Sequence, residues 1–237
     1  MGLKERRVLL LVSSALYYRY CSKILRLTCC VDAYLMTRTL LIGTGNQGKL
    51  REIRKILGYV PFGLRDANDL DAPEETGDSY TANAIAKAQY YANATGLWAL
   101  ADDSGLEVEA LDGGPGIFSS RYAGDNATDA DRRALLIAEL ATNQNRSRRA
   151  RFVCVVAVAA PDQTVLKVAE GFCEGVIAPA PRGTGGFGYD PLFVPDGYEL
   201  TFAELPEAVK NRLSHRGRAL AQVKEFLLAE ECALDHP

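Results

Sequence analysis

A short apolar run that leads through glycines into an amphipathic helix constrains the fold of this chain more than any other feature. Thr-Leu-Leu-Ile at 39–42 is typical of a buried strand, and apolar residues then recur at helical spacing over 46–57 until Gly58. A glycine turn between a strand and a helix directs backbone N–H groups and the positive end of the helix dipole at one point. The segment therefore predicts an anion site, with phosphate as the favoured ligand.

The rest of the chain predicts one α/β domain with a mixed sheet. Helical spacing and end signals predict three further helices, at 80–94, 128–140 and 214–230. Apolar and β-branched runs predict further strands, at 97–101, 152–159 and 165–177. A turn separates the last two runs, which indicates an antiparallel hairpin. A βαβ-like start followed by hairpins favours a sheet with both parallel and antiparallel pairs.

Composition and charge exclude several classes of protein. The chain has 48% hydrophobic and 24% charged residues, which is ordinary for a globular protein and excludes extended disorder. Its formal charge is −3, whereas a general DNA-coating protein is strongly basic. No apolar run reaches the roughly 18 to 20 residues of a spanning helix. We therefore expect neither a nucleic-acid nor a membrane partner.

The first 36 residues differ in character from the remainder. They carry six basic and two acidic residues and begin like a secretory signal, but tyrosines interrupt the apolar stretch and no clear cleavage site follows. Since Met36 stands just before the first convincing strand, we expect an extension at 1–36 read from an upstream start codon. A genuine but incidental helix and a targeting segment are the alternatives. The expected domain spans 37–231, with a tail at 232–237.

Cysteine usage favours the cytoplasm. Three of the six cysteines lie in the extension, and the others, Cys154, Cys173 and Cys232, are scattered. They form no CxxC pair and no Cys/His spacing of a metal site. Cys154 and Cys173 lie in apolar runs, where a free thiol behaves as a small hydrophobic side chain.

The glycine-rich stretch at 43–49 is open to three interpretations. It matches both the dinucleotide pattern G-x-G-x-x-G and the start of a Walker loop, G-x-x-x-x-G-K. A Walker loop needs a hydroxyl next, where this chain has Leu50. A dinucleotide fold needs an acid about 20 residues on, and Asp66 and Asp69 are near that distance, but 59–64 is a poor strand. The third interpretation is that the glycines serve only a tight turn.

Two aspartates at the end of the predicted strand 97–101 are candidate metal ligands. Side chains alternate across a strand, so Asp102 and Asp103 are expected to point to opposite faces and to act differently. Mg²⁺ prefers oxygen ligands and usually takes one or two carboxylates together with substrate phosphate. The acidic pair Glu74 and Glu75 is the obvious second source. The alternative is that these acids are simply solvated.

Six motifs, in order along the chain, resemble those of the inosine/xanthosine triphosphate pyrophosphatase family. The resemblance runs from about residue 37 to 228 and does not cover the extension. The motifs are Thr44-Gly45-Asn46-x-x-Lys49, Glu74-Glu75-Thr76-Gly77, Asn83-Ala84-x-x-Lys87-Ala88, Asp102-Asp103-Ser104-Gly105, Gly186-Phe187-Gly188-Tyr189-Asp190-Pro191 and Ser214-His215-Arg216-Gly217.

The resemblance implies an elongated mixed β-sheet with flanking helices that form two lobes around a central nucleotide cleft. It also implies a homodimer and Mg²⁺-dependent hydrolysis of non-canonical purine nucleoside triphosphates (ITP, dITP, XTP) to monophosphate and pyrophosphate. Asp103 would be the catalytic base, and Glu75 with Asp103 would bind the metal. The implied substrate-binding residues are Thr44, Gly45, Asn46, Gln47, Gly48, Lys49, Lys87, Ser104, Phe187, Gly188, Tyr189, Asp190, Lys210, His215 and Arg216.

Purine selectivity requires groups that tell a 6-keto oxygen from a 6-amino group. A donor from His215 or Arg216 would pair with the keto oxygen and oppose the amino group of adenine, and Phe187 can stack on the ring. Taken alone, a single histidine is more often structural, and a lysine such as Lys87 on an alanine-rich helix is ordinarily solvated. The alternative functions are a pyrophosphatase for other modified or pyrimidine nucleotides, a nucleotide-binding module without hydrolysis and, remotely, a dehydrogenase.

Overall fold

The computed structural model describes residues 39–232. The predicted extension at 1–36, with its three cysteines, lies outside the described residues, as do residues 233–237 of the expected tail. In the described part, no helix is both long and apolar enough to cross a membrane.

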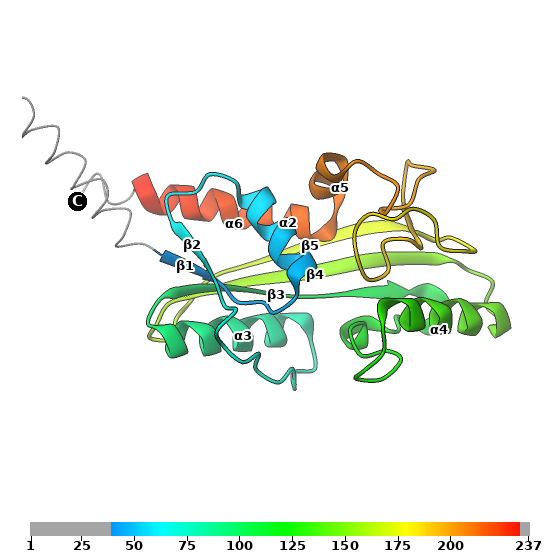
Figure 1. Cartoon of the computed structure of the whole chain (residues 1–237), viewed down its shortest axis with the longest axis horizontal. Coiled ribbons are helices and arrows are strands. Elements are labelled where there is room, and N and C mark those ends of the chain that lie inside the picture. Colours follow the sequence, from blue (N-terminus) through cyan, green and yellow to red (C-terminus); the bar gives the residue numbers. More distant parts are fainter. Residues whose placement is uncertain (1–38, 233–237) are drawn as a thin grey trace, which may run out of the picture.

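A six-stranded mixed sheet forms the centre of the molecule (Figure 1). The short strand β1 pairs in parallel with β2 on one side and β3 on the other, whereas β3, β4, β5 and β6 pair antiparallel. The predicted mixed sheet and the predicted hairpin, β4–β5, are therefore confirmed. In spatial order β2-β1-β3-β4-β5-β6, the strands span Gly63–Asp66, Thr39–Ile42, Trp98–Val108, Arg149–Ala159, Val165–Ile177 and Phe193–Pro195.

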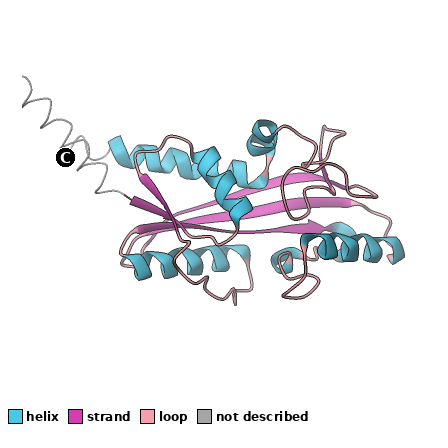
Figure 2. Cartoon of the chain, in the orientation of Figure 1, coloured by secondary structure: helices cyan, strands magenta, loops and turns pink. Residues whose placement is uncertain are grey.

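Helices cover both faces of the sheet (Figures 1 and 2). Helices α2, α5 and α6 lie on one face, and α3 and α4 lie on the other. Their bounds are Gln47–Leu57 (α2), Tyr80–Thr95 (α3), Asp129–Thr142 (α4), Glu207–Leu213 (α5) and His215–Cys232 (α6). The four predicted helices are confirmed to within a few residues, whereas the short α5 was not predicted. Two single-turn 3₁₀ helices, Glu109–Leu111 and Gly116–Phe118, follow β3.

Polar caps explain where three of the helices begin. Asn46 and Ser79 accept backbone N–H groups in the first turns of α2 and α3. Thr128 and Asp131 form the predicted capping box of α4, with the aspartate in the position usually held by Glu. Gly58 and Gly96 follow the last residues of α2 and α3 at positive φ, which ends both helices.

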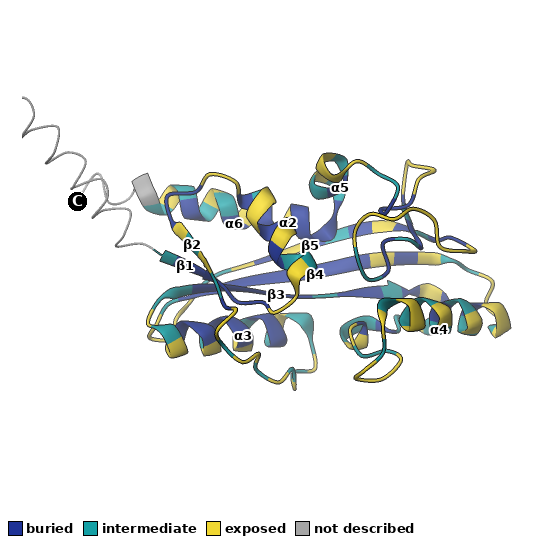
Figure 3. Ribbon diagram, viewed as in Figure 1, coloured by how far each residue is buried: buried dark blue, intermediate teal, exposed yellow. Residues whose placement is uncertain are grey.

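Side-chain alternation along β4 divides the core between the two faces. Cys154, Val156 and Val158 pack with α2 and α6, while the intervening residues pack with α3. A third cluster fills the opposite end of the sheet, where Phe152 and Phe193 meet Leu136 of α4. The two ends of the sheet are therefore packed by different clusters, which confirms the elongated fold with two lobes. The middle of the sheet is buried (Figure 3).

Strand β3 corrects one prediction about the site. Asp102 and Asp103 lie in the middle of an eleven-residue strand, not at its end, because β4 pairs with β3 along its whole length. The parallel pairing with β1, however, stops where Ile42 meets Leu100. Both aspartates therefore lie just beyond the last parallel pair, where that edge of β3 is no longer covered by β1.

The segment 59–64, judged a poor strand, enters the sheet only at its last two residues. Residues 63–66 form β2, because β1 supplies its backbone hydrogen bonds and the short strand sits at the edge of the sheet. The carboxylate of Asp66 accepts a hydrogen bond from Arg54 Nε at 2.9 Å. The acid that a dinucleotide fold would use for ribose is therefore engaged with an arginine.

Candidate nucleotide site

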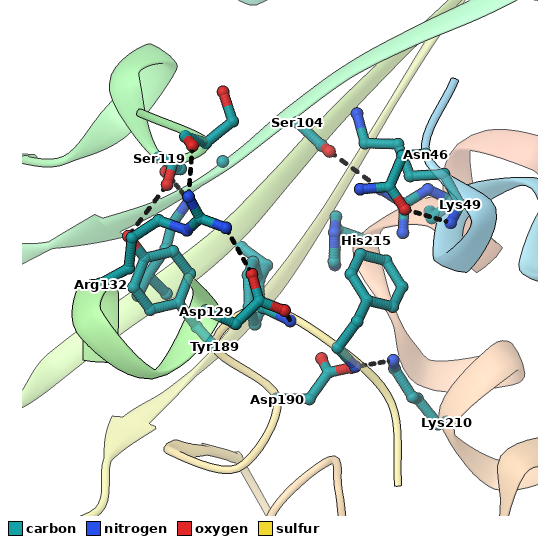
Figure 4. A pocket seen from close by; sticks show the side chains of 17 residues that line it. Asn46, Lys49, Ser104, Ser119, Asp129, Arg132, Tyr189, Asp190, Lys210 and His215 are labelled. Carbon is teal, nitrogen blue, oxygen red and sulfur yellow. Dashed lines mark hydrogen bonds and ion pairs between the residues drawn. The ribbon is translucent and has the colours of Figure 1, made fainter. Parts of the chain in front are cut away.

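A pocket lies between the two lobes, and ten of the predicted site residues line it. They come from the cap and first turn of α2, from β3, from the loop at 182–190 and from α5 and α6. Figure 4 shows Asn46, Lys49 and Ser104 at one end, Asp129 and Arg132 at the other, and His215 between them. The predicted residues in its wall are Asn46, Lys49, Ser104, Phe187, Gly188, Tyr189, Asp190, Lys210, His215 and Arg216.

In the predicted phosphate loop, two of the backbone amides that could bind an anion are already bonded to a side chain. The side-chain oxygen of Asn46 accepts hydrogen bonds from the N–H groups of Gly48 at 2.9 Å and Lys49 at 3.0 Å. These two donors of the helix terminus are therefore already satisfied by the cap. The ammonium group of Lys49 remains the strongest attraction for an anion at this end of the pocket.

A fully buried carboxylate links the phosphate loop to α6. One oxygen of Asp102 lies 3.1 Å from Lys49 Nζ and accepts hydrogen bonds from Arg216 Nη2 at 3.1 Å and Nε at 3.3 Å. Burial alone would raise the pKa of Asp102, but the two cations outweigh it and hold that pKa well below the ordinary value. Arg216 Nη2 also donates to Ser104 Oγ at 2.9 Å, so one guanidinium joins two residues of β3.

A second buried carboxylate, which the sequence reasoning missed, bonds two cationic residues of the pocket wall. Glu52 of α2 accepts hydrogen bonds from Lys210 Nζ at 2.7 Å and Arg216 Nη1 at 2.6 Å. Burial would raise the pKa of Glu52, but Arg216 and Lys210 lower it overall. The sequence contained one indication of this role. Glu52 follows Lys49 by three residues in the predicted helix, so both residues lie on the same side of α2.

Asp190 extends this network into the glycine-rich loop. Lys210 Nζ also donates to the carboxylate of Asp190. The same oxygen of Asp190 accepts the backbone N–H of Phe187 at 2.8 Å. Through Lys210, Glu52 of α2 is therefore connected to the backbone of the aromatic residue predicted to stack on a base.

The other face of β3 carries a separate cluster of charges. Lys87 Nζ of α3 donates to Glu75 at 2.5 Å and to Asp103 Oδ1 at 3.5 Å, and Asn83 donates to Asp103 Oδ2 at 3.0 Å. The prediction that Asp102 and Asp103 point to opposite faces is confirmed, and Lys87 is buried, not solvated. Burial raises the pKa of Asp103, and Glu75 adds to this, against the opposing effect of Lys87 and Lys49.

The donor set at this cluster fits Mg²⁺. Glu75 and Asp103 meet at one lysine nitrogen, so both carboxylates lie within reach of a shared cation. Among residues 39–232, no three Asp, Glu, His or Cys side chains gather closely enough to hold a metal by themselves. Two carboxylates with substrate phosphate completing the shell is the usual arrangement for Mg²⁺. Glu74, the neighbour of Glu75, is exposed.

The pocket wall also contains a histidine and a phenylalanine, which are predicted to contact a base. His215 is buried and stacks on Phe152 at 4.5 Å between ring centroids, and its Nδ1 has no hydrogen-bond partner within the described part of the chain. Burial, with Arg216 and Lys210 nearby, holds its pKa well below 6.5, so the ring is neutral. Phe187 lies with its ring 5.1 Å from Lys210 Nζ.

The ring of Phe187 also rests on the phosphate loop. A Cβ atom added at Gly48 would lie 2.5 Å from Phe187 Cδ1, closer than real side chains allow. The glycine therefore permits the loop at 182–190 to touch the first turn of α2. The predicted phosphate loop and the aromatic residue predicted to stack on a base therefore touch each other.

The remaining predicted residues lie close to the pocket but outside its wall. Thr44 and Gly45 precede the helix cap, and Gln47 Nε2 donates to Asn68 at 3.5 Å on the exposed side. Sequence reasoning missed several wall residues, of which Ser119, Ser120, Asp129 and Arg132 carry polar side chains. These four come from segments that no motif singled out.

The fold and the site together define an α/β nucleotide-binding enzyme. A family model described as "Ham1 family" matches residues 40–226. The dITP/XTP pyrophosphatase of Geobacter sulfurreducens is 50% identical over 195 residues, which cover 81% of this chain and 97% of that protein. The dITP/XTP pyrophosphatase of Nostoc sp. is 48% identical over 187 residues, covering 78% and 92%.

A solved structure agrees with these sequence relationships. The HAM1 protein from Coxiella burnetii superposes with a TM-score of 0.73 and 42% sequence identity, and the match covers 80% of this chain and 98% of that one. The chain belongs to the Ham1 family.

Proposed function

We propose that this protein hydrolyses non-canonical purine nucleoside triphosphates, namely ITP, dITP and XTP, to the monophosphate and pyrophosphate, with Mg²⁺ as the cofactor. The relatives named dITP/XTP pyrophosphatase support this assignment. One observation in the structure carries it. The buried carboxylate of Asp102 binds Lys49, from the phosphate loop, and Arg216, which follows His215 at the base end, while Asp103 beside it faces the cluster suited to a metal.

The proposed reaction breaks the bond between the α-phosphorus and the bridging oxygen of the leaving pyrophosphate. Asp103 accepts a proton from the attacking water, and its raised pKa makes it a better base than an exposed carboxylate. Lys49 and Lys87 place positive charge beside the phosphoryl oxygens. Mg²⁺, held by Glu75 and Asp103, would neutralise charge on the triphosphate and on the leaving group.

Selection of the base is proposed to depend on the donors still free at the base end. Most of the guanidinium N–H groups of Arg216 are engaged by Asp102, Glu52 and Ser104. The ring of His215 lines the pocket and is neutral, because burial holds its pKa well below 6.5. We therefore assign His215 as the main discriminating contact and Arg216 as its support. A site that donates to a keto oxygen disfavours the 6-amino group of adenine.

The assembly and location are proposed on the family resemblance. We propose a homodimer that acts in the cytoplasm, where the two buried cysteines, Cys154 and Cys173, stay as free thiols. Sedimentation of the purified protein at micromolar concentration measures the assembly: a single species of twice the 25.8 kDa chain mass is expected.

Pyrophosphate release from ITP, XTP, ATP and GTP, measured with and without Mg²⁺, tests the activity. The expected result is Mg²⁺-dependent release of pyrophosphate from ITP and XTP, with little from ATP and GTP. Asp103→Asn should abolish turnover while the thermal midpoint stays near that of the wild type. Equal turnover of ATP, or release of orthophosphate, contradicts the proposal. Tight ITP binding without product would identify a nucleotide-binding module, and faster turnover of pyrimidine nucleotides would identify a different pyrophosphatase.

A further inference from the structure

Two side chains of α4 bind the two backbone polar groups of one residue in the glycine-rich loop, Gly188. Asp129 Oδ2 accepts the backbone N–H of Gly188 at 2.7 Å. Arg133 Nη1 donates to the carbonyl oxygen of Gly188 at 2.6 Å. The residues are four positions apart, so they share one face of the helix. The backbone of Gly188 is therefore bonded in both directions to an element more than fifty residues away in sequence.

Gly188 is next to the residue whose ring forms part of the pocket wall, Phe187. Gly188 has a φ of +58°, in the left-handed region, and follows Phe187 directly. A Cβ at Gly188 would meet no atom within 4 Å, so its backbone conformation, and not crowding, calls for glycine. The N–H of Gly188 belongs to the peptide unit shared with Phe187, so holding it restricts the direction in which Phe187 projects its side chain.

The aspartate is held ready for this contact. Its other oxygen, Oδ1, accepts Arg132 Nη2 at 2.6 Å, and Asp129 lies in the first turn of α4, where the helix dipole favours a negative charge. Burial would raise the pKa of Asp129, but bonds from Arg132 and Gly188 lower it overall. The carboxylate is therefore ionised and oriented, and Figure 4 shows Asp129 at the pocket wall next to Arg132.

Other contacts hold the loop on either side of Gly188. The N–H of Phe187 is bonded to Asp190, which is paired with Lys210 of α5, and the ring of Phe187 rests on Gly48 of α2. The hydroxyl of Tyr189 donates to the carbonyl oxygen of Ser119 at 3.0 Å. The contacts of Asp129 and Arg133 add the attachment of the Gly188 backbone itself to α4.

We propose that Asp129 and Arg133 are positioning residues of the base-binding end, which hold the backbone of Gly188 so that the Phe187 ring stays in place to stack on the base. This inference rests on the proposed function, because it assumes a base-bearing substrate in the pocket. It assigns to α4, which carries none of the family motifs described above, a part in recognising that substrate. The residues act through Phe187 and need not touch the nucleotide.

The expected consequence is a loss of substrate binding with little effect on the chemical step. Stacking of a base on an aromatic ring is worth enough that its partial loss should raise KM about five- to tenfold. Because such a contact is made equally in the ground and transition states, kcat should change by less than about twofold. Inhibition by inorganic tripolyphosphate, which has no base, should be unaffected.

The test compares Asp129→Ala with Asp131→Ala in the full-length protein. Both aspartates lie in the first turn of α4 and both favour its N-terminus, but Asp131 bonds only Thr128 of the capping box. Asp129→Ala should raise KM for ITP, and the Kd for ITP measured by calorimetry, by about five- to tenfold. Asp131→Ala should lower the thermal midpoint but leave KM and Kd unchanged. Asp129→Asn should recover part of the loss, since its amide oxygen can still accept the Gly188 N–H.

Arg133→Ala is an independent variant that removes only the hydrogen bond to the Gly188 carbonyl oxygen. Its KM and Kd for ITP test the inference if Asp129→Ala does not fold. Equal KM and Kd values in wild type, Asp129→Ala and Arg133→Ala overturn the inference. A parallel loss of tripolyphosphate inhibition also overturns it, because that result indicates general damage to the site. If the wild type binds ITP without releasing pyrophosphate, the proposed function fails while the Kd comparison still decides the inference. If the wild type does not bind ITP, both fail.

Discussion

Asp102 and Asp103 are consecutive residues of β3 whose carboxylates serve opposite faces of the sheet. Asp102 binds Lys49 and Arg216 on the face covered by α2 and α6. Asp103 binds Lys87 and Asn83 on the face covered by α3. One anchors the groups proposed to hold the phosphates and the base, and the other belongs to the proposed metal cluster. Their separation results directly from the two-residue period of a strand.

Removing the Glu75 carboxylate should weaken metal binding specifically. Glu75→Gln is expected to raise the Mg²⁺ concentration for half-maximal pyrophosphate release by about tenfold or more, because a proposed carboxylate ligand is lost. A titration of Mg²⁺ at saturating ITP measures it. Glu74→Gln is the matched control, since that neighbouring side chain is exposed. If the two variants need the same Mg²⁺ concentration, Glu75 is not a ligand.

A methyl group at Gly48 should disturb the Phe187 ring. Gly→Ala within a helix ordinarily stabilises it by up to about 1 kcal/mol, so Gly48→Ala should not lower the thermal midpoint. It should nevertheless raise KM for ITP several-fold, because the new Cβ would lie 2.5 Å from Phe187 Cδ1. A double-mutant cycle with Phe187→Ala, which removes the atoms that the new Cβ would meet, checks the cause: the effect of Gly48→Ala should largely disappear in that background. Additive effects would place the damage elsewhere.

Glu52 should matter for stability as well as for the site. Glu52→Gln leaves the buried cations Lys210 and Arg216 with less compensating charge, and the expected loss of unfolding free energy is about 3 kcal/mol. Urea denaturation measures it. Glu207→Gln is the control, because the pair that Glu207 makes with Lys55 is half exposed and should be worth less than about 1 kcal/mol. Similar losses in the two variants would refute the importance of burial.

The neutral state of His215 predicts a pH dependence of stability. The folded protein holds the pKa of His215 well below 6.5, so below pH 6.5 the unfolded chain binds a proton at this residue and the folded one does not. Unfolding free energy should therefore fall as the pH is lowered from 7 to 5, by at most about 1.4 kcal/mol per pH unit for this proton. His215→Phe should show a correspondingly shallower slope. An unchanged slope would mean that His215 takes up a proton in the folded state.

Local patterns predicted the helices and the hairpin because each is set by residues close in sequence. Asn46, Thr128 and Gly96 act on their own neighbours, and the apolar run at 152–159 has no alternative to burial. The length of β3 and the existence of β2 could not be predicted in this way. Both depend on pairing partners, since β4 extends β3 past Asp103 and β1 supplies the bonds of β2.

The candidate site shows the same division. Residues within recognisable motifs, such as Lys49 and His215, were found from the sequence, and the pocket brings them together. Glu52, Asp129 and Arg133 were missed because they act on residues 55 to 164 positions away. A single carboxylate or guanidinium on an amphipathic helix does not reveal such a partner. Only the fold does.

The continuous ladder of β3, β4 and β5 passes through both lobes without a break at the site. A hinge between the lobes would have to bend these paired strands close to Asp102 and Asp103, and would shift both carboxylates together. Sheets with long antiparallel pairing resist such bending. If the cleft narrows around a substrate, the movement must come from the bordering segments, chiefly the glycine-rich loop at 182–190 and the acidic stretch at 67–79, while the carboxylates keep a constant spacing.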